Sequence, residues 1–304
     1  MIVITGGDGF IGRNLVFEFS ITNNKLPIKI LDTKRESLND IYIWLTNNAS
    51  SIKTIIHLGA ITDTTLENSE LFYEYNLGMS MFIWKLCSKY DITLIYASSA
   101  ATYGDGSYGF DDKSDIWKLK PLNLYGWSKH NFDLWSQLEH KSPKNWYGLK
   151  FFNVYGKFEE YKLRMSSMIY QIYNQIIDNG YVKLFKSNTF NILDGEQKRD
   201  FIHIDDVVNV IIFLINRLPK SGIYNVGTGI ARSFNDIANI IFHNLGIPPN
   251  IKYIDIPDSI SDKYQNFTEA KIDKLKEIGY SIKFKSLEYG ISEYLKYLNY
   301  LKKW

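Results

Sequence analysis

The sequence predicts an α/β fold, in which a doubly wound parallel sheet is joined to a second, smaller α/β domain. Short apolar runs alternate with longer segments whose apolar residues recur every three to four positions, as in β-α-β units around a parallel sheet. A glycine array separates the first apolar run from the first helical segment. After about residue 155 the alternation is less regular, which favours a separate second domain.

The first half of the chain contains the candidates for the main sheet. Its predicted strands are residues 2–5, 28–31, 54–58, 92–97 and 147–154. Its predicted helices lie near residues 10–21, 37–48, 69–90 and 125–140.

The second half alternates in a looser way. Its helices are predicted near residues 163–179, 205–217, 232–245, 269–278 and 285–301, between the apolar runs "KLF", "DFIHI", "IYNVG" and "IKYIDI". The polar segment 186–198, which contains Asn and Gly, is predicted to be a loop. The basic C-terminal stretch "LKYLNYLKKW" is expected to pack as a last helix of the domain rather than to anchor a membrane.

Composition restricts the class of protein. The chain has 304 residues with 35 basic and 33 acidic side chains, so its net charge of +2 indicates neither nucleic acid nor an anionic membrane as a partner. The single cysteine, Cys87, lies in an apolar helical pattern and cannot form an internal disulfide. Because no apolar run is long enough to span a bilayer and the N-terminus begins directly with a strand, a cytoplasmic protein is expected.

The glycine array is the first functional signal. Gly6, Gly9 and Gly12 in "ITGGDGFIGRNL" form a GxxGxxG pattern between a strand and a helix. Glycines allow a tight turn and a close approach of backbone to a pyrophosphate, and the helix N-terminus adds oriented N–H groups. We therefore expect a dinucleotide-binding domain in residues 1–155 with returning segments near 199–228. The substrate-binding domain is expected in 156–304, mainly 156–198 and 229–304.

The end of the second strand bears on the choice of dinucleotide. Asp32 follows Gly12 by about 20 residues, where an acidic side chain typically binds the adenosine ribose hydroxyls. Lys34 and Arg35 come next and could neutralise a 2′-phosphate. Asp32 favours NAD and the two basic residues favour NADP, so this stretch alone leaves the choice open. NADP is the expected cofactor, with NAD as the alternative.

A tyrosine–lysine pair is the second functional signal. Tyr125 and Lys129 in "YGWSK" are four residues apart at a helix start, so they share one helix face. A nearby ammonium favours the phenolate of a tyrosine, which is otherwise a poor base at neutral pH. Ser98 and Ser99, in "YASSAATYG", lie at the exit of the preceding predicted strand.

These motifs together resemble the extended short-chain dehydrogenase/reductase family, whose members have a Rossmann-type fold and act mostly on nucleotide sugars. The resemblance extends over nearly the whole chain and rests on "TGGDGFIG", "HLGA", Asn76, "SSAATYG", "YGWSK", "FFNVYG", "RDFIHIDDV" and "YNVGTG". It implies a homo-oligomer that binds a nicotinamide cofactor and a nucleotide-sugar substrate.

The resemblance also implies which residues serve the site. The cofactor would contact Gly6, Gly9, Phe10, Ile11, Gly12, Asp32, Thr33, Lys34, Leu58, Gly59, Ala60, Ile61, Thr62, Asn76, Tyr125, Lys129, Val154 and Lys162. The substrate would contact Ser99, Asn153, Arg164, Gln171, Phe185, Arg199 and Tyr264. Catalysis would depend on Ser99, Tyr125, Lys129 and Lys162.

Within the family the chain is most similar to epimerases of ADP-heptoses, which serve the synthesis of the lipopolysaccharide core. Such an enzyme removes a hydride from C6, forms a 6-keto sugar and returns the hydride to the other face. Because the hydroxyl points differently in the two epimers, two acid/base groups are needed. Tyr125 is one, and Lys162 matches the second. Arg164 and Gln171 replace a serine and a histidine of the family's substrate pocket, and the loop 188–197 is longer than usual.

Three alternatives remain. A 4,6-dehydratase needs an acid pair just after the strand-exit serine, where this chain has Ala100, Ala101 and Thr102. A C4 epimerase of another nucleotide sugar needs no such pair. A non-catalytic cofactor-binding protein usually lacks the tyrosine or the lysine. We expect no metal site, and we interpret His57 and His203, in apolar strands, as structural.

Overall fold

The computed structural model describes residues 1–22, 26–257 and 264–302, and the chain divides into two compact units. Unit 1 comprises Met1–Phe151, Val207–Val226 and Ile272–Ser281, and unit 2 comprises Phe152–Asp206, Gly227–Lys271 and Ile282–Trp304. The predicted division placed residues 199–206 in the first domain and residues 272–281 in the second. In the structure, residues 199–206 belong to unit 2 and residues 272–281 belong to unit 1.

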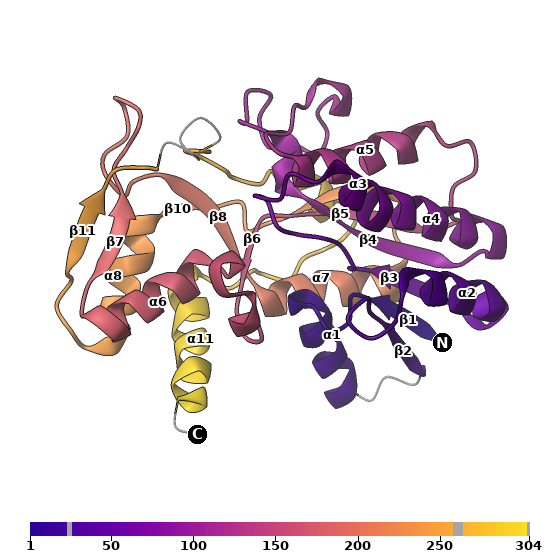
Figure 1. Cartoon of the computed structure of the whole chain (residues 1–304), viewed down its shortest axis with the longest axis horizontal. Helices are drawn as coiled ribbons and strands as arrows, with labels where there is room; N and C mark the ends of the chain where they lie inside the picture. Colours follow the sequence, from indigo (N-terminus) through magenta and orange to yellow (C-terminus); the bar gives the residue numbers. More distant parts are fainter. Residues whose placement is uncertain (23–25, 258–263, 303–304) are drawn as a thin grey trace. The chain divides into compact units, whose positions relative to one another are not determined.

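The core of unit 1 is a six-stranded, fully parallel sheet with the order β2-β1-β3-β4-β5-β9 (Figure 1). This confirms the predicted α/β class with a parallel sheet. Its strands are β1 (Ile2–Thr5), β2 (Ile28–Leu31), β3 (Thr54–His57), β4 (Thr93–Ser99), β5 (Trp146–Phe151) and β9 (Gly222–Val226).

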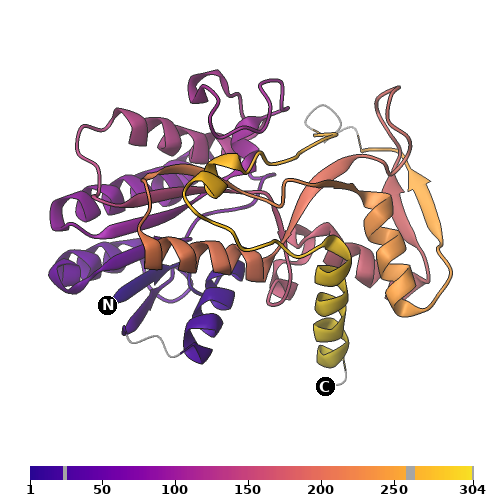
Figure 2. The same ribbon diagram turned by 180° about the vertical axis from the view of Figure 1, so that it is seen from behind.

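Helices cover both faces of this sheet, as the alternating pattern predicts. The helices of unit 1 are α1 (Phe10–Ile21), α2 (Leu38–Asn48), α3 (Ser69–Leu71), α4 (Met79–Tyr90), α5 (Leu124–Leu138), α10 (Asp273–Glu277) and most of α7 (Ile204–Arg217). Residues of α2, α4 and α5 form one apolar cluster with β1, β3 and β4. Seen from behind in Figure 2, α7 runs along the opposite side of the sheet.

Strand order decides where a ligand can bind in unit 1. From β1 the chain passes to β2 on one side and then to β3 on the other, so the order reverses between β1 and β3. Ligands of open α/β sheets bind in the crevice outside the carboxyl ends of strands at such a reversal. Gly6, Leu58 and the end of β4 at Ser99 all lie at that edge.

Two predicted elements are interrupted in the structure. The predicted strand 147–154 divides at Phe152 into β5 and β6 (Asn153–Tyr155), which belong to different sheets. The predicted helix 69–90 is divided into α3, the π-helix η2 (Phe72–Gly78) and α4. Apolar periodicity does not reveal either break, because both halves of each segment are apolar.

The described residues of unit 2 form two small sheets and three main helices. A three-stranded sheet has the order β10-β8-β6, and a two-stranded parallel sheet pairs β11 with β7. The further strands are β7 (Val182–Phe185), β8 (Lys198–His203), β10 (Ala231–Ser233) and β11 (Ile251–Ile254). The helices are α6 (Met168–Asn179), α8 (Phe234–Leu245) and α11 (Leu287–Leu301).

The three helices of unit 2 enclose its hydrophobic core. Ile172 and Ile176 of α6, Ile241 of α8, and Tyr294 and Leu298 of α11 are all at most 3% exposed and belong to one cluster. The predicted C-terminal helix is therefore confirmed as a packing helix. No helix in the described part of the chain is both long enough and apolar enough to cross a membrane.

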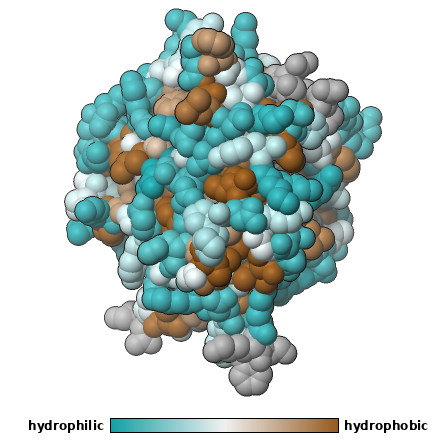
Figure 3. Space-filling model, turned by 90° about the vertical axis from the view of Figure 1, so that its left-hand side faces the viewer, coloured by the Kyte–Doolittle hydropathy of each residue, from teal (hydrophilic) through white to brown (hydrophobic). Residues whose placement is uncertain are grey.

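The surface of unit 2 beside β11 and β7 is mixed. Strand β7 alternates buried and exposed residues, with Val182 and Leu184 in the core and Lys183 exposed. Tyr253 and Ile254 on β11 are partly exposed. Viewed from this side, hydrophobic areas are separated by hydrophilic ones (Figure 3).

A single buried carboxylate, Asp200 of β8, joins three segments of unit 2. It accepts hydrogen bonds from the backbone N–H and hydroxyl of Thr228 at 2.8 and 2.7 Å. The N–H groups of Gly229 and Ala270 donate to it at 2.9 and 3.0 Å. Burial raises the pKa of Asp200, and these donors oppose that rise. Asp200 therefore satisfies backbone groups that would otherwise be buried without partners.

We predict that Asp200→Ala lowers the free energy of unfolding by about 3 to 5 kcal/mol, because several buried donors lose their acceptor. Chemical denaturation monitored by circular dichroism measures this change. Asp178→Ala, at an exposed position on α6, is the matched control and should change stability by no more than about 0.5 kcal/mol. Equal effects of the two substitutions would contradict the role of Asp200.

Candidate active site

The backbones after β1 and β3 approach each other so closely that a side chain would not fit. A Cβ on Gly6 would lie 2.5 Å from the backbone nitrogen of Gly59, and Gly6 has a φ of +69°. A Cβ on Gly12 would lie 2.3 Å from the carbonyl oxygen of Gly6. Two glycines of the array are therefore required by the fold of the loop itself.

The same loop leaves a helix N-terminus open. Helix α1 begins after Gly9, whose backbone is extended and which has no side chain to cap the helix. The first N–H groups of α1 therefore receive no cap from the side chain of the residue before the helix. With the glycine cradle they fit the pyrophosphate of a dinucleotide, which favours oriented N–H donors and the positive end of a helix.

Asp32 lies at the end of β2, 6% exposed, as expected for a ribose-binding carboxylate. Its two carboxylate oxygens accept hydrogen bonds from the N–H groups of Asp8 at 2.9 Å and Lys34 at 3.0 Å. The carboxylate of Asp8 forms a two-bond ion pair with Arg35. The guanidinium of Arg35 is therefore already matched by a negative charge.

The predicted segment 58–62 is held by Asn76 of η2. The side-chain amide of Asn76 accepts from the N–H of Ile61 at 2.8 Å and donates to its carbonyl at 2.9 Å. It also donates to the hydroxyl of Ser128 at 2.9 Å, and that hydroxyl donates to the carbonyl of Tyr125 at 2.8 Å. Asn76 thus links the loop after β3 to the helix that carries Tyr125.

Ser99 and Tyr125 lie together in unit 1. Ser99 ends β4, and its hydroxyl accepts from the N–H of Ala101 at 3.1 Å. Helix α5 is capped by Asn123, whose side chain accepts from the N–H of Gly126 at 2.8 Å, so Tyr125 stands in the first turn. Burial raises the pKa of Tyr125, and a hydrogen bond with the Ser99 side chain opposes this rise. The Ser99 side chain therefore lies close enough to Tyr125 to affect the pKa of its phenol.

Lys129 follows Tyr125 by one turn and is 6% exposed. Burial lowers the pKa of Lys129 to about 8, against the attraction of Asp133. His57 lies near this ammonium, and burial lowers its pKa to about 3, so the ring is neutral. Its ring nitrogens hydrogen-bond Thr5 at 2.7 Å and Ser80 at 3.0 Å. His57 thus has a structural role, as its apolar strand suggested.

In unit 2 the structure gathers three of the predicted substrate residues. Arg199, 8% exposed, has its guanidinium carbon 5.4 Å from the ring centre of Tyr264 and 5.7 Å from that of Phe234. The ring of Phe185 meets Tyr264 edge-on, with centres 5.8 Å apart. Burial lowers the pKa of Arg199 to about 10, so the side chain is still charged at neutral pH. A buried guanidinium beside aromatic rings is suited to a phosphate and a flat base.

Lys162 lies in the 3-10 helix η5 (Glu160–Met165) of unit 2. Burial lowers its pKa, as an amine that exchanges protons near neutral pH requires, while Glu159 opposes the shift. Glu159 is fully buried and accepts from the N–H of Gly156 at 3.1 Å and from the N–H and hydroxyl of Ser167 at 2.5 and 2.8 Å. It therefore holds both ends of the Lys162 segment.

The remaining predicted residues of unit 2 lie close to that segment or on β6. The side chain of Gln171 donates to the carbonyl groups of Arg164 at 3.2 Å and Ser166 at 2.8 Å, so this amide supports the segment. Arg164 is exposed. Asn153, exposed, and Val154, half-buried, pair with Phe201 and Ile202 of β8. Burial lowers the pKa of His203 to about 4, and its ring packs edge-on against Tyr155.

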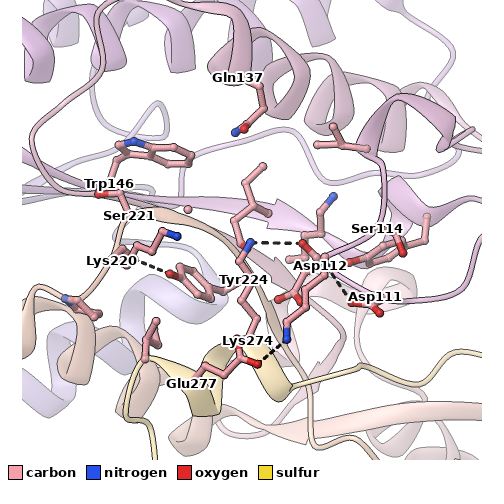
Figure 4. A pocket seen from close by; sticks show the side chains of 18 of the residues that line it. Asp111, Asp112, Ser114, Gln137, Trp146, Lys220, Ser221, Tyr224, Lys274 and Glu277 are labelled. Atoms are coloured by element: carbon pink, nitrogen blue, oxygen red, sulfur yellow. Dashed lines mark hydrogen bonds and ion pairs between the residues drawn. The ribbon is translucent and has the colours of Figure 1, made fainter.

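A separate cavity of about 820 Å³ lies in unit 1 beside the amino-terminal halves of β5 and β9 (Figure 4). Trp146, Tyr224 and Lys274 line it. Lys274 donates to the carbonyl groups of Ile223 at 2.7 Å and Asp112 at 3.3 Å. Tyr103 and Lys150 also line this cavity, so it reaches the segment that follows Ser99.

Several charged residues of these sites were not singled out from the sequence. They are Asp8, Asp133, Lys150, Glu159 and Asp200, and all but Asp8 are buried. The signal available in the sequence was a charge inside an apolar run, as for Lys150 in "GLKFF" and Asp200 in "KRDFIHI". Buried charges of this kind need partners, but the sequence does not say which.

Comparison with known proteins decides the family. The model of the NAD dependent epimerase/dehydratase family matches residues 2–227. The chain belongs to this family. The resemblance to extended short-chain dehydrogenases/reductases is thereby confirmed, and the parallel sheet with its glycine loop is the family's dinucleotide-binding part.

Two curated members of the family are similar over almost their full length. An ADP-L-glycero-D-manno-heptose-6-epimerase of Fusobacterium nucleatum subsp. nucleatum is 43% identical, with 100% of this chain and 98% of the relative covered. An enzyme of the same name from Nitratidesulfovibrio vulgaris is 38% identical, with 97% of each chain covered. The crystal structure of the Helicobacter pylori enzyme of that name superposes with a TM-score of 0.81 at 30% identity, with 98% of this chain and 96% of that chain covered.

We predict that Gly6→Ala weakens the binding of a nicotinamide dinucleotide by at least about tenfold, because the new Cβ forces the loops after β1 and β3 apart. Isothermal titration calorimetry measures this loss. Gly109→Ala is the matched control, because Gly109 has a similar φ of +75° but no atom within 4 Å of the added Cβ. Unchanged affinity in Gly6→Ala would show that the close approach is not needed for binding.

Proposed function

We propose that the chain is an epimerase that inverts C6 of ADP-D-glycero-β-D-manno-heptose to give ADP-L-glycero-β-D-manno-heptose. The observation that carries this proposal is the pairing of Ser99 with Tyr125, one helical turn before Lys129, in a chain similar to epimerases over its full length. The first proton-transfer group and the cofactor-binding loop belong to unit 1. Lys162, proposed as the second proton-transfer group, and most of the proposed sugar-binding residues belong to unit 2.

The residues of unit 1 provide one acid/base group. A bound nicotinamide dinucleotide supplies the hydride acceptor and donor. Tyr125 takes the proton of the C6 hydroxyl as the carbonyl forms, and Ser99 donates a hydrogen bond to the same oxygen. Lys129, one turn along the same helix, is proposed to stabilise the phenolate by its positive charge. Proton transfer by a positioned side chain typically contributes about 10² to 10⁴ in rate.

Lys162 is proposed as the second acid/base group. Removal of a hydride from C6 leaves a planar ketone, and inversion requires its return to the opposite face. The C6 oxygen then points in a new direction and needs a different proton donor. Lys162 suits this role because burial lowers its pKa, which favours the neutral amine that a base requires.

The nucleotide part of the substrate is assigned to the aromatic and cationic cluster of unit 2. Arg199 is proposed to bind the pyrophosphate, and Phe185 and Tyr264 to contact the nucleotide. Asn153, Arg164 and Gln171 are proposed to contact the sugar. Arg164 and Gln171 stand where the family has a serine and a histidine, so they are the positions at which sugar preference would differ.

Two other reactions of the family are less well supported by the site. After Ser99 the short 3-10 helix η3 (Ala100–Tyr103) begins with Ala100, Ala101 and Thr102, which provide no carboxylic acid for an elimination of water. A C4 epimerase of another nucleotide sugar needs the same serine, tyrosine and lysine. It differs in which sugar carbon faces Tyr125, so activity on UDP-sugars distinguishes it.

We predict that the purified protein converts the D-glycero into the L-glycero ADP-heptose, detected by NMR of the product. Tyr125→Phe and Lys162→Met should each lower kcat by about 10² to 10⁴, because each removes one proton-transfer group. Lys183→Met, at an exposed position of β7, is the matched control for Lys162→Met.

Each outcome separates the candidate functions. An absence of L-glycero product, together with C4 inversion of a UDP-sugar, would replace the proposed reaction by the alternative epimerase. Release of a dehydrated sugar would indicate a dehydratase. Full activity of the combined Tyr125→Phe and Lys162→Met variant would remove both residues from the mechanism.

The choice between NADP and NAD depends on the charges around Asp32. The sequence expectation was NADP with NAD as the alternative, because Lys34 and Arg35 could neutralise a 2′-phosphate. Two carboxylates, Asp8 and Asp32, balance these two cations, and Arg35 is paired with Asp8. A dianionic phosphate gains little from a neutral set of charges. We therefore propose that NAD binds at least as well as NADP.

We predict that Asp8→Asn shifts the ratio of the two affinities toward NADP by about tenfold, because Arg35 loses its counter-ion and becomes free to bind a 2′-phosphate. Calorimetric titration with both dinucleotides measures the ratio. Asp40→Asn, exposed on α2, is the control. A wild-type preference for NADP that Asp8→Asn leaves unchanged would contradict the charge argument.

A cytoplasmic location and a homo-oligomer remain part of the proposal.

A further inference from the structure

Two opposite charges are buried behind the serine of the site. Asp133 lies on α5 and Lys150 on β5, and their side chains are 0% and 3% exposed. The ammonium of Lys150 is 2.9 Å from one carboxylate oxygen of Asp133. A buried ion pair rarely adds stability compared with an apolar pair of the same volume, so its partners must be examined for another role.

The partners of this pair surround Ser99. The hydroxyl of Ser98, the residue before it, donates to Asp133 at 2.7 Å. The ammonium of Lys150 donates to the hydroxyl of Thr102 at 2.5 Å. That hydroxyl in turn donates to the carbonyl of Ser99 at 2.7 Å. The end of β4 is therefore held on both sides of Ser99 by one ion pair.

Asp133 is also placed to act on the charge of the site. It follows Lys129 by one turn of the same helix, and its attraction raises the pKa of Lys129 against the effect of burial. Lys150 neutralises this carboxylate. Lys129 therefore shares its counter-ion with a second cation, and the region keeps a net positive charge that favours a phenolate at Tyr125.

Other titratable side chains surround the pair. Those on the packed elements are Tyr96 on β4, Tyr103 on η3, His57 on β3, and Tyr125, Lys129 and His130 on α5. Asp111, Asp112, Lys113 and Lys274 line the cavity that Lys150 also lines. Burial keeps the two histidines neutral, since it lowers the pKa of His57 to about 3 and that of His130 to about 4. It raises the pKa of both Tyr96 and Tyr103. The carboxylate of η2, Glu74, is exposed.

We propose that Asp133 and Lys150 form a positioning pair that holds Ser99 beside Tyr125 and preserves the positive potential at Tyr125. Neither side chain is placed on the substrate, so both act through other residues. The inference rests on the proposed function only for the role of Tyr125 as the base. It identifies two residues that control the base without contacting the reacting atoms.

The size of the electrostatic effect follows from the helix. Tyr125 and Asp133 are eight residues apart on α5, which corresponds to about 12 Å. One uncompensated charge at that distance, with an effective dielectric constant of about 20, moves a titration midpoint by about one pH unit. Whether the midpoint rises or falls depends on whether Asp133 or Lys150 keeps its charge.

The test is the titration of the Tyr125 phenolate by ultraviolet absorbance, with oxidised dinucleotide bound and the Tyr125→Phe protein subtracted. Lys150→Met should raise the midpoint by about one pH unit, because Asp133 is left negative, and Asp133→Asn should lower it by about the same amount. Asp133→Asn combined with Lys150→Met should return it close to wild type. Lys144→Met, exposed before β5, is the matched control and should leave the midpoint unchanged.

Activity provides the second readout. Each single variant should lower kcat by at least about tenfold with little change in KM, because Ser99 and Tyr125 act on the transition state rather than on substrate binding. Unchanged midpoints in the single variants would overturn the proposal, even with reduced kcat. If Lys150→Met does not fold, the test uses Asp133→Asn and the double variant. An Asp133→Asn protein whose Tyr125 titration midpoint is not lowered would then contradict the proposal.

The absorbance titration needs no sugar, so it separates the two proposals. Shifted midpoints in a protein without epimerase activity would leave the positioning pair in place and reject the proposed function. Epimerase activity with unshifted midpoints would support the proposed function and reject the positioning pair.

Discussion

The contact between the backbones of Gly6 and Gly59 is the constraint on which the site in unit 1 depends. At this point the chain passes from β1 to one neighbouring strand and later returns to the other, and the two loops leave no room for a Cβ between them. The close contact aligns the start of α1 with the ends of β1 and β3. The start of α1, the buried carboxylate of Asp32 and a loop held by Asn76 then meet at one edge of the sheet.

Buried charge is the second organising feature, and each instance has a different set of partners. Asp200 and Glu159 accept hydrogen bonds from backbone N–H groups and hydroxyls, so they join segments of unit 2. Asp133 instead has Lys150 as a direct partner and Lys129 one turn away. The first arrangement satisfies donors, while the second also sets the potential at a neighbouring tyrosine.

The catalytic hypothesis follows from the types of side chain that these features bring together. A tyrosine with a raised pKa is an ineffective base unless positive charge lies close to it, and Lys129 supplies that charge within the same helix. The alanines after Ser99 leave the site without an acid for elimination. Hydride and proton transfer are thus the chemistry that the residues support, in agreement with the family and with the names of its most similar members considered above.

The sequence by itself determined the parallel α/β sheet, the glycine loop and the tyrosine–lysine pair. Each of these depends on local spacing: strand and helix periods, glycines at a turn, or two residues one helical turn apart. Only the tertiary structure showed that the strand predicted at 147–154 divides between two sheets, that residues 272–281 return to unit 1, and that Arg35 is paired with Asp8. It also revealed Asp133 and Lys150 as partners. Such pairings join side chains that are distant in the sequence and come into contact only in the folded protein, so local spacing cannot predict them.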